Sequence, residues 1–199
     1  MFNKFINQIK EQGDLNEAEI AYLKEHAKIV ICKRHEEIIS AGKMVKDIYF
    51  VIDGCVRMFY NVDGNHKTAF FYNSGDFIWT GRDANSPIQK NYETIEDTVL
   101  VKINKQIVYD LMESSANLES IIRYYKEREL IAYQHLIAHF ITLSPEERFL
   151  HLVENNKALV QRVPQQYIAS YLGVSAETLS RIKRRVYEKE KEAMLMSTF

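Results

Sequence analysis

The stretch that decides the fold is residues 163–185, VPQQYIASYLGVSAETLSRIKRR, where a single glycine separates two short blocks with helical apolar spacing. We expect Pro164 to begin the first helix, Gly173 to end it and Ser175 to cap the second, because these residue types favour those positions. The apolar positions expected to form the inner faces are Ile168, Leu172, Leu179, Ile182 and Val186. Two helices joined through a tight glycine turn form a helix-turn-helix.

Two further residues fit the close packing of such a motif. Ala169 is small where the helices must approach, and Val174 would fill the angle between them. The second helix presents groups that read base edges and grip phosphates in a DNA major groove. Its outward positions are Ala176, Glu177, Thr178, Ser180, Arg181 and Arg184, with Lys183 and Arg185 added near its carboxyl end. A solvated helix hairpin is the alternative, but the register of the apolar positions favours DNA binding.

Length and composition limit the class of protein. The 199 residues fit one large domain or two small ones, and 46% hydrophobic with 27% charged residues is typical of a soluble globular protein. A net charge of -1 argues against a uniformly basic nucleic-acid binder, so a DNA site must be local. The chain has no run of about 18 apolar residues, and its amino end is too polar for a signal peptide. Cys32 and Cys55 match no metal or redox spacing and favour reduced thiols in a cytoplasmic protein.

The first half of the chain carries a β pattern. Six of the seven glycines fall at or before Gly81, and turns between strands need residues that accept positive φ. Residues 16–27 read as a capped helix, and short strand candidates with Gly-containing turns follow them. The strand candidates are KIVICK, EEIIS, DIYFVID, CVRMFYN, KTAFFYN, DFIWT, YETIED and TVLVKI. The pattern predicts an α+β protein with an amino-terminal antiparallel β-roll of the jelly-roll kind.

A rolled sheet of this kind can hold a small ligand in its interior. The side chains that could line an effector pocket are Phe70, Phe71, Tyr72, Phe77, Trp79, Arg82 and Tyr92. Most aromatic residues of a β domain are simply core, and this alternative stays open for each of them.

Residues 116–143 lack Gly and Pro and are expected to form a long helix. Their apolar residues follow a nearly heptad seam, and a helix of about 40 Å outgrows a small domain. The expected seam is Leu118, Ile121, Ile122, Tyr125, Ala132, Leu136, Phe140 and Leu143, with Glu129 at its edge or paired across it. We therefore expect the helix to pack on a second copy of itself in a homodimer; the alternative is a helix lying along its own β domain.

His135 and His139 stand four apart on this helix, which would put both imidazoles on one face. The glutamate of an HExxH metalloprotease helix is missing, and no third ligand lies nearby in the sequence. We expect interfacial or surface histidines here rather than a metal site.

The order of β-roll, long helix and helix-turn-helix resembles the CRP/FNR family of bacterial transcription regulators. The roll segment HEEIISAGKMVKDIYFVIDGCVRMFY, the turn NSGDFI and the recognition-helix motif ETLSR are similar to the family's patterns. The resemblance implies that Glu177, Ser180 and Arg181 read bases, in a half-site like TTGA within a palindrome. The residues expected on the DNA backbone are Thr178, Lys183, Arg184 and Arg185. It also implies RNA polymerase as a partner and a small-molecule effector in the roll.

This order divides the chain into a sensor domain with amino-terminal helices (1–114), a dimerisation helix (115–143) and a DNA-binding domain (144–199).

Three departures from the family matter. The Gly-Glu-Leu and Arg-Ser/Thr-Ala elements that hold a cyclic nucleotide are not matched, although Arg82 and Lys90 could contact an anion. The cysteines of an iron-sulfur sensor are absent. RVYEKEKEAMLMSTF replaces the β-hairpin wing and reads as a continued helix.

Two other functions remain as alternatives. A cupin-like enzyme would use the same roll with a metal, but only His35 and His66 fall near strands and no HxH pair occurs. A helix-turn-helix used only for protein contacts is the second. We expect no catalytic residues, no metal and no resident cofactor.

Overall fold

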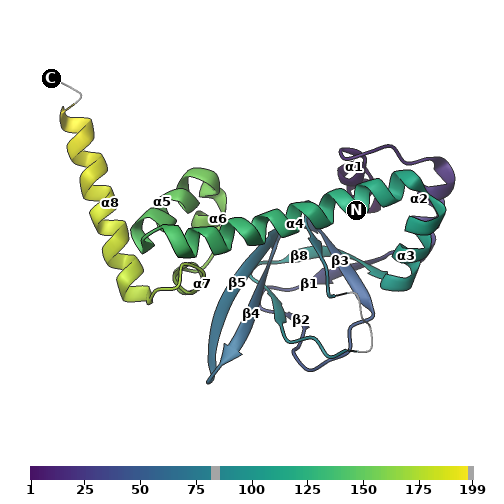
Figure 1. Ribbon diagram of the computed structural model, residues 1–199, viewed down its shortest axis with the longest axis horizontal. Helices are drawn as coiled ribbons and strands as arrows, with labels where there is room; N and C mark the ends of the chain where they lie inside the picture. The colour runs from purple at the N-terminus through teal and green to yellow at the C-terminus, as the bar shows by residue number, and fades with distance from the viewer. Residues whose placement is uncertain (82–85, 197–199) are drawn as a thin grey trace.

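The computed structural model describes residues 1–81 and 86–196, in which one long helix joins a β-roll to a group of helices (Figure 1). The α+β prediction is confirmed, and each predicted strand segment contains a strand. In chain order the elements are α1 (Phe2–Lys10), α2 (Glu17–His26), β1 (Lys28–Cys32), β2 (Glu37–Ile39), β3 (Asp47–Asp53), β4 (Cys55–Val62), β5 (Asn65–Asn73), β6 (Phe77–Ile78), β7 (Asn91–Thr94), β8 (Thr98–Asn104), α3 (Lys105–Ser114), α4 (Ala116–Thr142), α5 (Pro145–Asn155), α6 (Lys157–Arg162), α7 (Gln165–Tyr171) and α8 (Ala176–Met196).

The roll consists of two four-stranded antiparallel sheets, in the strand orders β1-β8-β3-β6 and β2-β7-β4-β5. Asp63 and Gly64 both have positive φ, 52° and 79°, which suits the tight turn of the β4–β5 hairpin. Gly54, between β3 and β4, has φ 98°, and a Cβ there would lie 2.8 Å from the Cα of Thr98. Large side chains fill the space between the sheets, and Tyr72 and Tyr92 are fully buried there.

A separate core joins the amino-terminal helices to the roll. Asn16 and Glu19 cap α2 reciprocally, as expected from the sequence. Helices α1 and α2 pack with α3 and the first half of α4 against β3 and β8. Four residues of the expected intermolecular seam are buried in this core: Leu118, Ile121, Ile122 and Tyr125. The seam prediction is wrong for this half of α4, because its apolar face covers the chain's own domain.

The second half of α4 runs from the roll toward the carboxyl-terminal helices (Figure 1). Glu129 does not sit at an intermolecular seam, because it accepts hydrogen bonds from the hydroxyls of Tyr72 (2.7 Å) and Tyr133 (3.2 Å) of its own chain. Burial raises the pKa of this carboxyl, and the two hydroxyls oppose the rise. Leu136 likewise faces a cavity within the chain.

Helices α5–α8 form the third core and dock on the roll. Ser144 and Glu147 cap α5 reciprocally, with proline at the first helical position. The Ser170 hydroxyl of α7 accepts a hydrogen bond from the backbone N–H of Thr68 on β5 at 2.8 Å. Arg57 of β4 stacks on the ring of Tyr167, 3.7 Å from its centroid. The helical domain therefore rests on the β4–β5 sheet rather than hanging free.

Candidate nucleic-acid interface

The helix-turn-helix is formed by α7 and the first turns of α8. Ile168, Ala169 and Leu172 face Leu179 and Ile182, and all five are at most 3% exposed. Gly173 is constrained in two ways. Its φ is +71°, a backbone angle that residues other than glycine rarely adopt. A Cβ at this position would lie 2.8 Å from the ring of Phe140 on α4.

Ser175 begins the second helix of the motif. Its hydroxyl accepts a hydrogen bond from the N–H of Thr178 at 3.2 Å, which is the N-cap contact expected from the sequence. The pKa of Glu177 is lowered by its own backbone N–H, by the Ser175 hydroxyl and by Arg181. A carboxylate held in this form at a helix N-terminus can accept a hydrogen bond from the amino group of a base.

The exposed face of α8 carries the residues expected to read bases. Glu177, Ser180 and Arg181 are exposed, and an Arg181 guanidinium nitrogen donates to the hydroxyl of Thr178 at 3.2 Å. Steps of three and four place this group on one side of the helix, and Arg184 continues it. Figure 1 shows α8 at the end of the molecule far from the roll, and all four of these side chains are exposed.

Two of the residues expected on the DNA backbone also contact α5. Arg185 forms an ion pair with Glu146 at 3.0 Å, a contact shared with Lys189 at 2.7 Å. The Lys183 ammonium lies 5.9 Å from the ring centroid of Phe149. Arg184 is exposed and only loosely paired with Glu188 at 4.0 Å. Among these cations, Arg184 is therefore the freest to meet a phosphate.

The wing region is helical in the described part of the chain. Helix α8 continues without interruption to Met196, through the segment that reads as a continued helix in the sequence. A winged motif normally places a β-hairpin after its recognition helix, so this part of the domain departs from that pattern.

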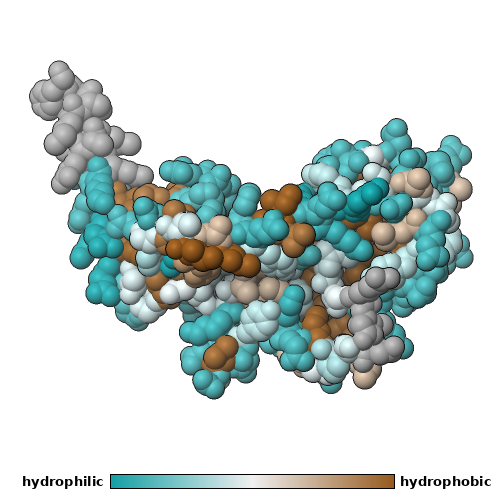
Figure 2. All heavy atoms as spheres, in the orientation of Figure 1, coloured by the Kyte–Doolittle hydropathy of each residue, from teal (hydrophilic) through white to brown (hydrophobic). Residues whose placement is uncertain are grey.

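An apolar stripe follows the outer side of α4. Large exposed fractions occur at Leu130 (57%), Ile131 (49%), Ile137 (60%) and Ile141 (78%). Leu130, Gln134, Ile137 and Ile141 are spaced 4, 3 and 4 residues apart, the spacing of a coiled-coil seam. Hydrophobic side chains are visible over the middle of α4 in Figure 2. The sequence contained this stripe, but the expected seam was placed on the opposite side of the helix.

The structure distributes the residues expected around an effector pocket over three cores. Phe71 packs with the carboxyl-terminal helices, Phe77 and Trp79 pack with the amino-terminal helices, and Tyr92 lies between the two sheets. Arg82 lies outside the described residues. Strand alternation contributes to the separation, since the successive residues Phe71 and Tyr72 of β5 point to opposite faces of the sheet and belong to different cores. Of the six expected pocket residues in the described ranges, Phe70, Phe71, Tyr72 and Phe77 line one cavity, whereas Trp79 and Tyr92 do not.

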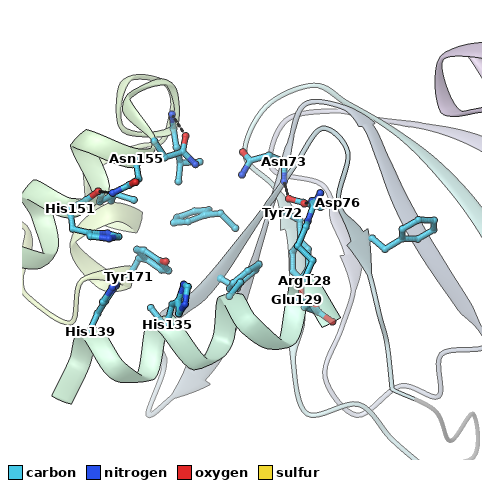
Figure 3. A pocket seen from close by; sticks show the side chains of 18 of the residues that line it. Tyr72, Asn73, Asp76, Arg128, Glu129, His135, His139, His151, Asn155 and Tyr171 are labelled. Carbon is cyan, nitrogen blue, oxygen red and sulfur yellow. Dashed lines mark hydrogen bonds and ion pairs between the residues drawn. The ribbon is translucent and has the colours of Figure 1, made fainter. Parts of the chain in front are cut away.

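This cavity lies between the roll and the carboxyl-terminal helices. It has a volume of about 350 Å³ and is lined by β5, α4, α5, the start of α6 and the end of α7. Figure 3 shows His135 and His139 projecting from α4 toward His151 and Tyr171. His151 was missed at the sequence level, because only the fold brings α5 back against α4.

No group of three or more His, Cys, Asp or Glu residues in the described ranges is placed to hold a metal ion. His35, one of the two strand-associated histidines, contacts Glu93 at 3.1 Å. His66, the other, contacts the buried Arg57, which also donates to Glu93 at 3.0 Å. None of the helices searched in the described chain is both long and apolar enough to span a membrane.

Comparison with known proteins gives a domain match and a set of similar folds. Residues 29–115 match the family model of the cyclic nucleotide-binding domain. No curated protein matches the sequence significantly.

Three solved structures illustrate the likeness. FixK2 from Bradyrhizobium japonicum is 20% identical, with a TM-score of 0.71 over 82% of this chain and 86% of that chain. The c-di-GMP responsive global regulator CLP from Xanthomonas campestris is 15% identical, with a TM-score of 0.72 over 88% of this chain and 93% of that chain. A putative transcriptional regulator of the CRP/FNR family from Eubacterium rectale is 18% identical, with a TM-score of 0.69 over 88% and 85%. At these identities the likeness concerns the fold.

Proposed function

We propose that this chain is a homodimeric, sequence-specific DNA-binding transcription regulator. It has the fold of CRP/FNR regulators, and residues 29–115 match the family model of the cyclic nucleotide-binding domain. The observation that carries the proposal is the helix-turn-helix with Glu177, Ser180 and Arg181 exposed on one side of its second helix. An exposed arginine can donate two hydrogen bonds to guanine, and a glutamate can accept one from cytosine.

The apolar stripe on α4 supports a dimer. Three large aliphatic side chains at coiled-coil spacing, Leu130, Ile137 and Ile141, are costly to leave in water, and a second copy of the same helix buries them symmetrically. A two-fold dimer presents two recognition helices to successive major grooves, about 34 Å apart. The target is therefore an inverted repeat, with half-sites centred roughly one helical turn apart.

We also propose that a small molecule controls the DNA affinity of the dimer. CLP is described as responsive to c-di-GMP, and we extend to this chain only the general idea of small-molecule control. RNA polymerase is the proposed protein partner, because a regulator bound beside a promoter acts through it.

Arg181→Ala tests the assignment of the base-reading face. Its loss should weaken binding to the specific duplex by about 1–3 kcal/mol and relax preference at one base pair. Fluorescence anisotropy with the specific duplex and with single-base variants measures both effects. Arg123→Ala is the matched control, because Arg123 is an exposed arginine of α4 whose ion pair among the described residues joins it to Glu119 of its own helix, at 3.7 Å. Equal losses in the two variants would show that Arg181 contributes charge and not recognition.

A further inference from the structure

The cavity between the domains has the size of a small-molecule site. Its volume of about 350 Å³ lies within the range of ligand pockets, about 300–1,000 Å³. Its walls come from the roll (Phe70–Asn73, Asp76 and Phe77), from α4 and from the helical domain. A ligand held there would touch both the roll and the helices that carry the recognition surface.

Three histidines of this wall, which we call the cavity histidines, are His135, His139 and His151. The ring centroids of His135 and His139 are 6.4 Å apart, and those of His139 and His151 are 4.2 Å apart. The ring nitrogens of the cavity histidines have no hydrogen-bond or ion-pair partner among the described residues. Each of the other histidines has a partner: His26 contacts the Tyr22 carbonyl, His35 contacts Glu93 and His66 contacts Arg57. The unpartnered imidazoles are therefore confined to the cavity.

The remaining charges around the cavity are already compensated. Arg128 of α4 pairs with Asp76 beside β5, and Glu129 accepts hydrogen bonds from two tyrosines. From α7, only the neutral Tyr171 faces the histidines, and α5 and the start of α6 add the amides of Asn155 and Asn156. Arg148 lines an adjoining hollow and donates to the carbonyl of Leu172 at 3.0 Å. Among the described residues that line the cavity, no carboxylate is thus left to pair with the cavity histidines.

This environment disfavours charge on His139. Burial lowers the pKa of His139, and the neighbouring His151 and His135 lower it further. A bound anion reverses both effects, because it pairs with an imidazolium and screens the mutual repulsion. Apolar side chains also line this cavity, including Phe71, Leu136 and Leu159. They can pack against the hydrocarbon part of an organic ligand.

We propose that this cavity is a binding site for a small organic anion, with a carboxylate or phosphate held by the cavity histidines and an apolar body against Phe71 and Leu136. The site lies outside the interior of the roll and goes beyond the proposed function. Its occupancy does not depend on DNA binding; only an effect of the ligand on DNA affinity rests on the proposed regulator.

Binding at this site takes up protons. The pKa of His139 is lowered in the free chain and a bound anion raises it, so affinity for the anion rises as the pH falls. A rise of one unit in the pKa of one histidine corresponds to about tenfold tighter binding below that pKa. Benzoate suits this test, because its charge is constant between pH 6 and pH 8.

The experiment uses the full chain with three probes: benzoate, phenyl phosphate and the neutral benzamide. Histidine ring signals in carbon–proton NMR report the pKa of each imidazole with and without probe, and calorimetry reports affinity at pH 6 and pH 8. We expect benzoate or phenyl phosphate to raise the pKa of His139 and to bind about tenfold more tightly at pH 6. The probe that raises the histidine pKa more and binds more tightly shows whether the site prefers a carboxylate or a phosphate.

Two variants and a control localise the effect. His139→Gln and His151→Gln keep a polar side chain but remove the titrating ring, and each should abolish most of the pH dependence. His26→Gln, on α2 far from the cavity, should leave it unchanged. If a variant fails to fold, the pKa shifts of the unaltered chain decide the question alone. The proposal is overturned if neither anion shifts the cavity histidines, if benzamide binds as well as benzoate, or if Zn²⁺ perturbs these rings while both anions leave them unchanged.

Discussion

Ile137→Ala tests which side of α4 forms the dimer. Ile137 lies in the middle of the apolar stripe and is 60% exposed in the single chain. Burying an isoleucine side chain fully contributes about 1.5–3 kcal/mol, so burying the exposed fraction contributes about 1–2 kcal/mol. A two-fold dimer contains the residue twice, and the change to alanine removes most of each side chain. The dimer should therefore lose about 2–3 kcal/mol, which raises its dissociation constant about 30- to 150-fold.

Sedimentation equilibrium over a range of protein concentrations measures this constant directly. Leu136→Ala is the matched control, because Leu136 is the neighbouring residue of the helix but lines the cavity within its own chain. Its replacement lowers the stability of the fold and leaves the dimer constant unchanged. If Leu136→Ala weakens the dimer and Ile137→Ala does not, the seam lies on the side first expected from the sequence and our reading of the exposed stripe is refuted.

Three further predictions concern other parts of the molecule. Arg184→Ala should weaken binding to specific and random duplexes alike and lower the slope of log affinity against log salt concentration by about one. Binding titrations at several salt concentrations measure both effects. A change in base preference would argue against a phosphate contact. In calorimetry, cyclic AMP and cyclic GMP should bind with a free energy no more favourable than about -4 kcal/mol. The buried rings of Tyr72 and Tyr92 fill the roll, and burying a phosphate without a partner is costly. Micromolar binding of either nucleotide would contradict this. Gly173→Ala should lower the free energy of unfolding by about 1–3 kcal/mol in urea titrations, because of its positive φ and the nearby Phe140 ring; an unchanged midpoint would contradict the strain argument.

Much of the fold can be predicted from local sequence signals. Turn glycines such as Gly54 and Gly64 mark the ends of strands, and the caps at Asn16 and Ser144 mark helix starts, because each signal acts within a few residues. The helix-turn-helix is equally local. Its inner face needs apolar residues at fixed spacing and its turn needs a glycine, so the sequence contains the whole motif.

The orientation of α4 could not be predicted in the same way. The helix carries apolar residues on more than one side, and periodicity alone does not say which side meets its own domain. Glu129 looked out of place on a seam, and it is in fact bonded to tyrosines from β5 and from its own helix. The aromatic residues Phe70, Phe71, Tyr72 and Phe77 of the cavity wall were among those expected to line a pocket. The histidine cluster was not predicted, because His151 joins His135 and His139 only through the packing of α5 on α4.

Binding-site selection from random duplex DNA with the full chain tests the central claim most directly. The proposal predicts enrichment of one inverted repeat, with half-sites like TTGA centred roughly one helical turn apart, because two recognition helices enter successive major grooves. The same selection with Arg181→Ala should lose preference at one position of each half-site. Recovery of an asymmetric motif, of a single half-site, or of no motif at all would contradict the account of a two-fold, sequence-reading dimer.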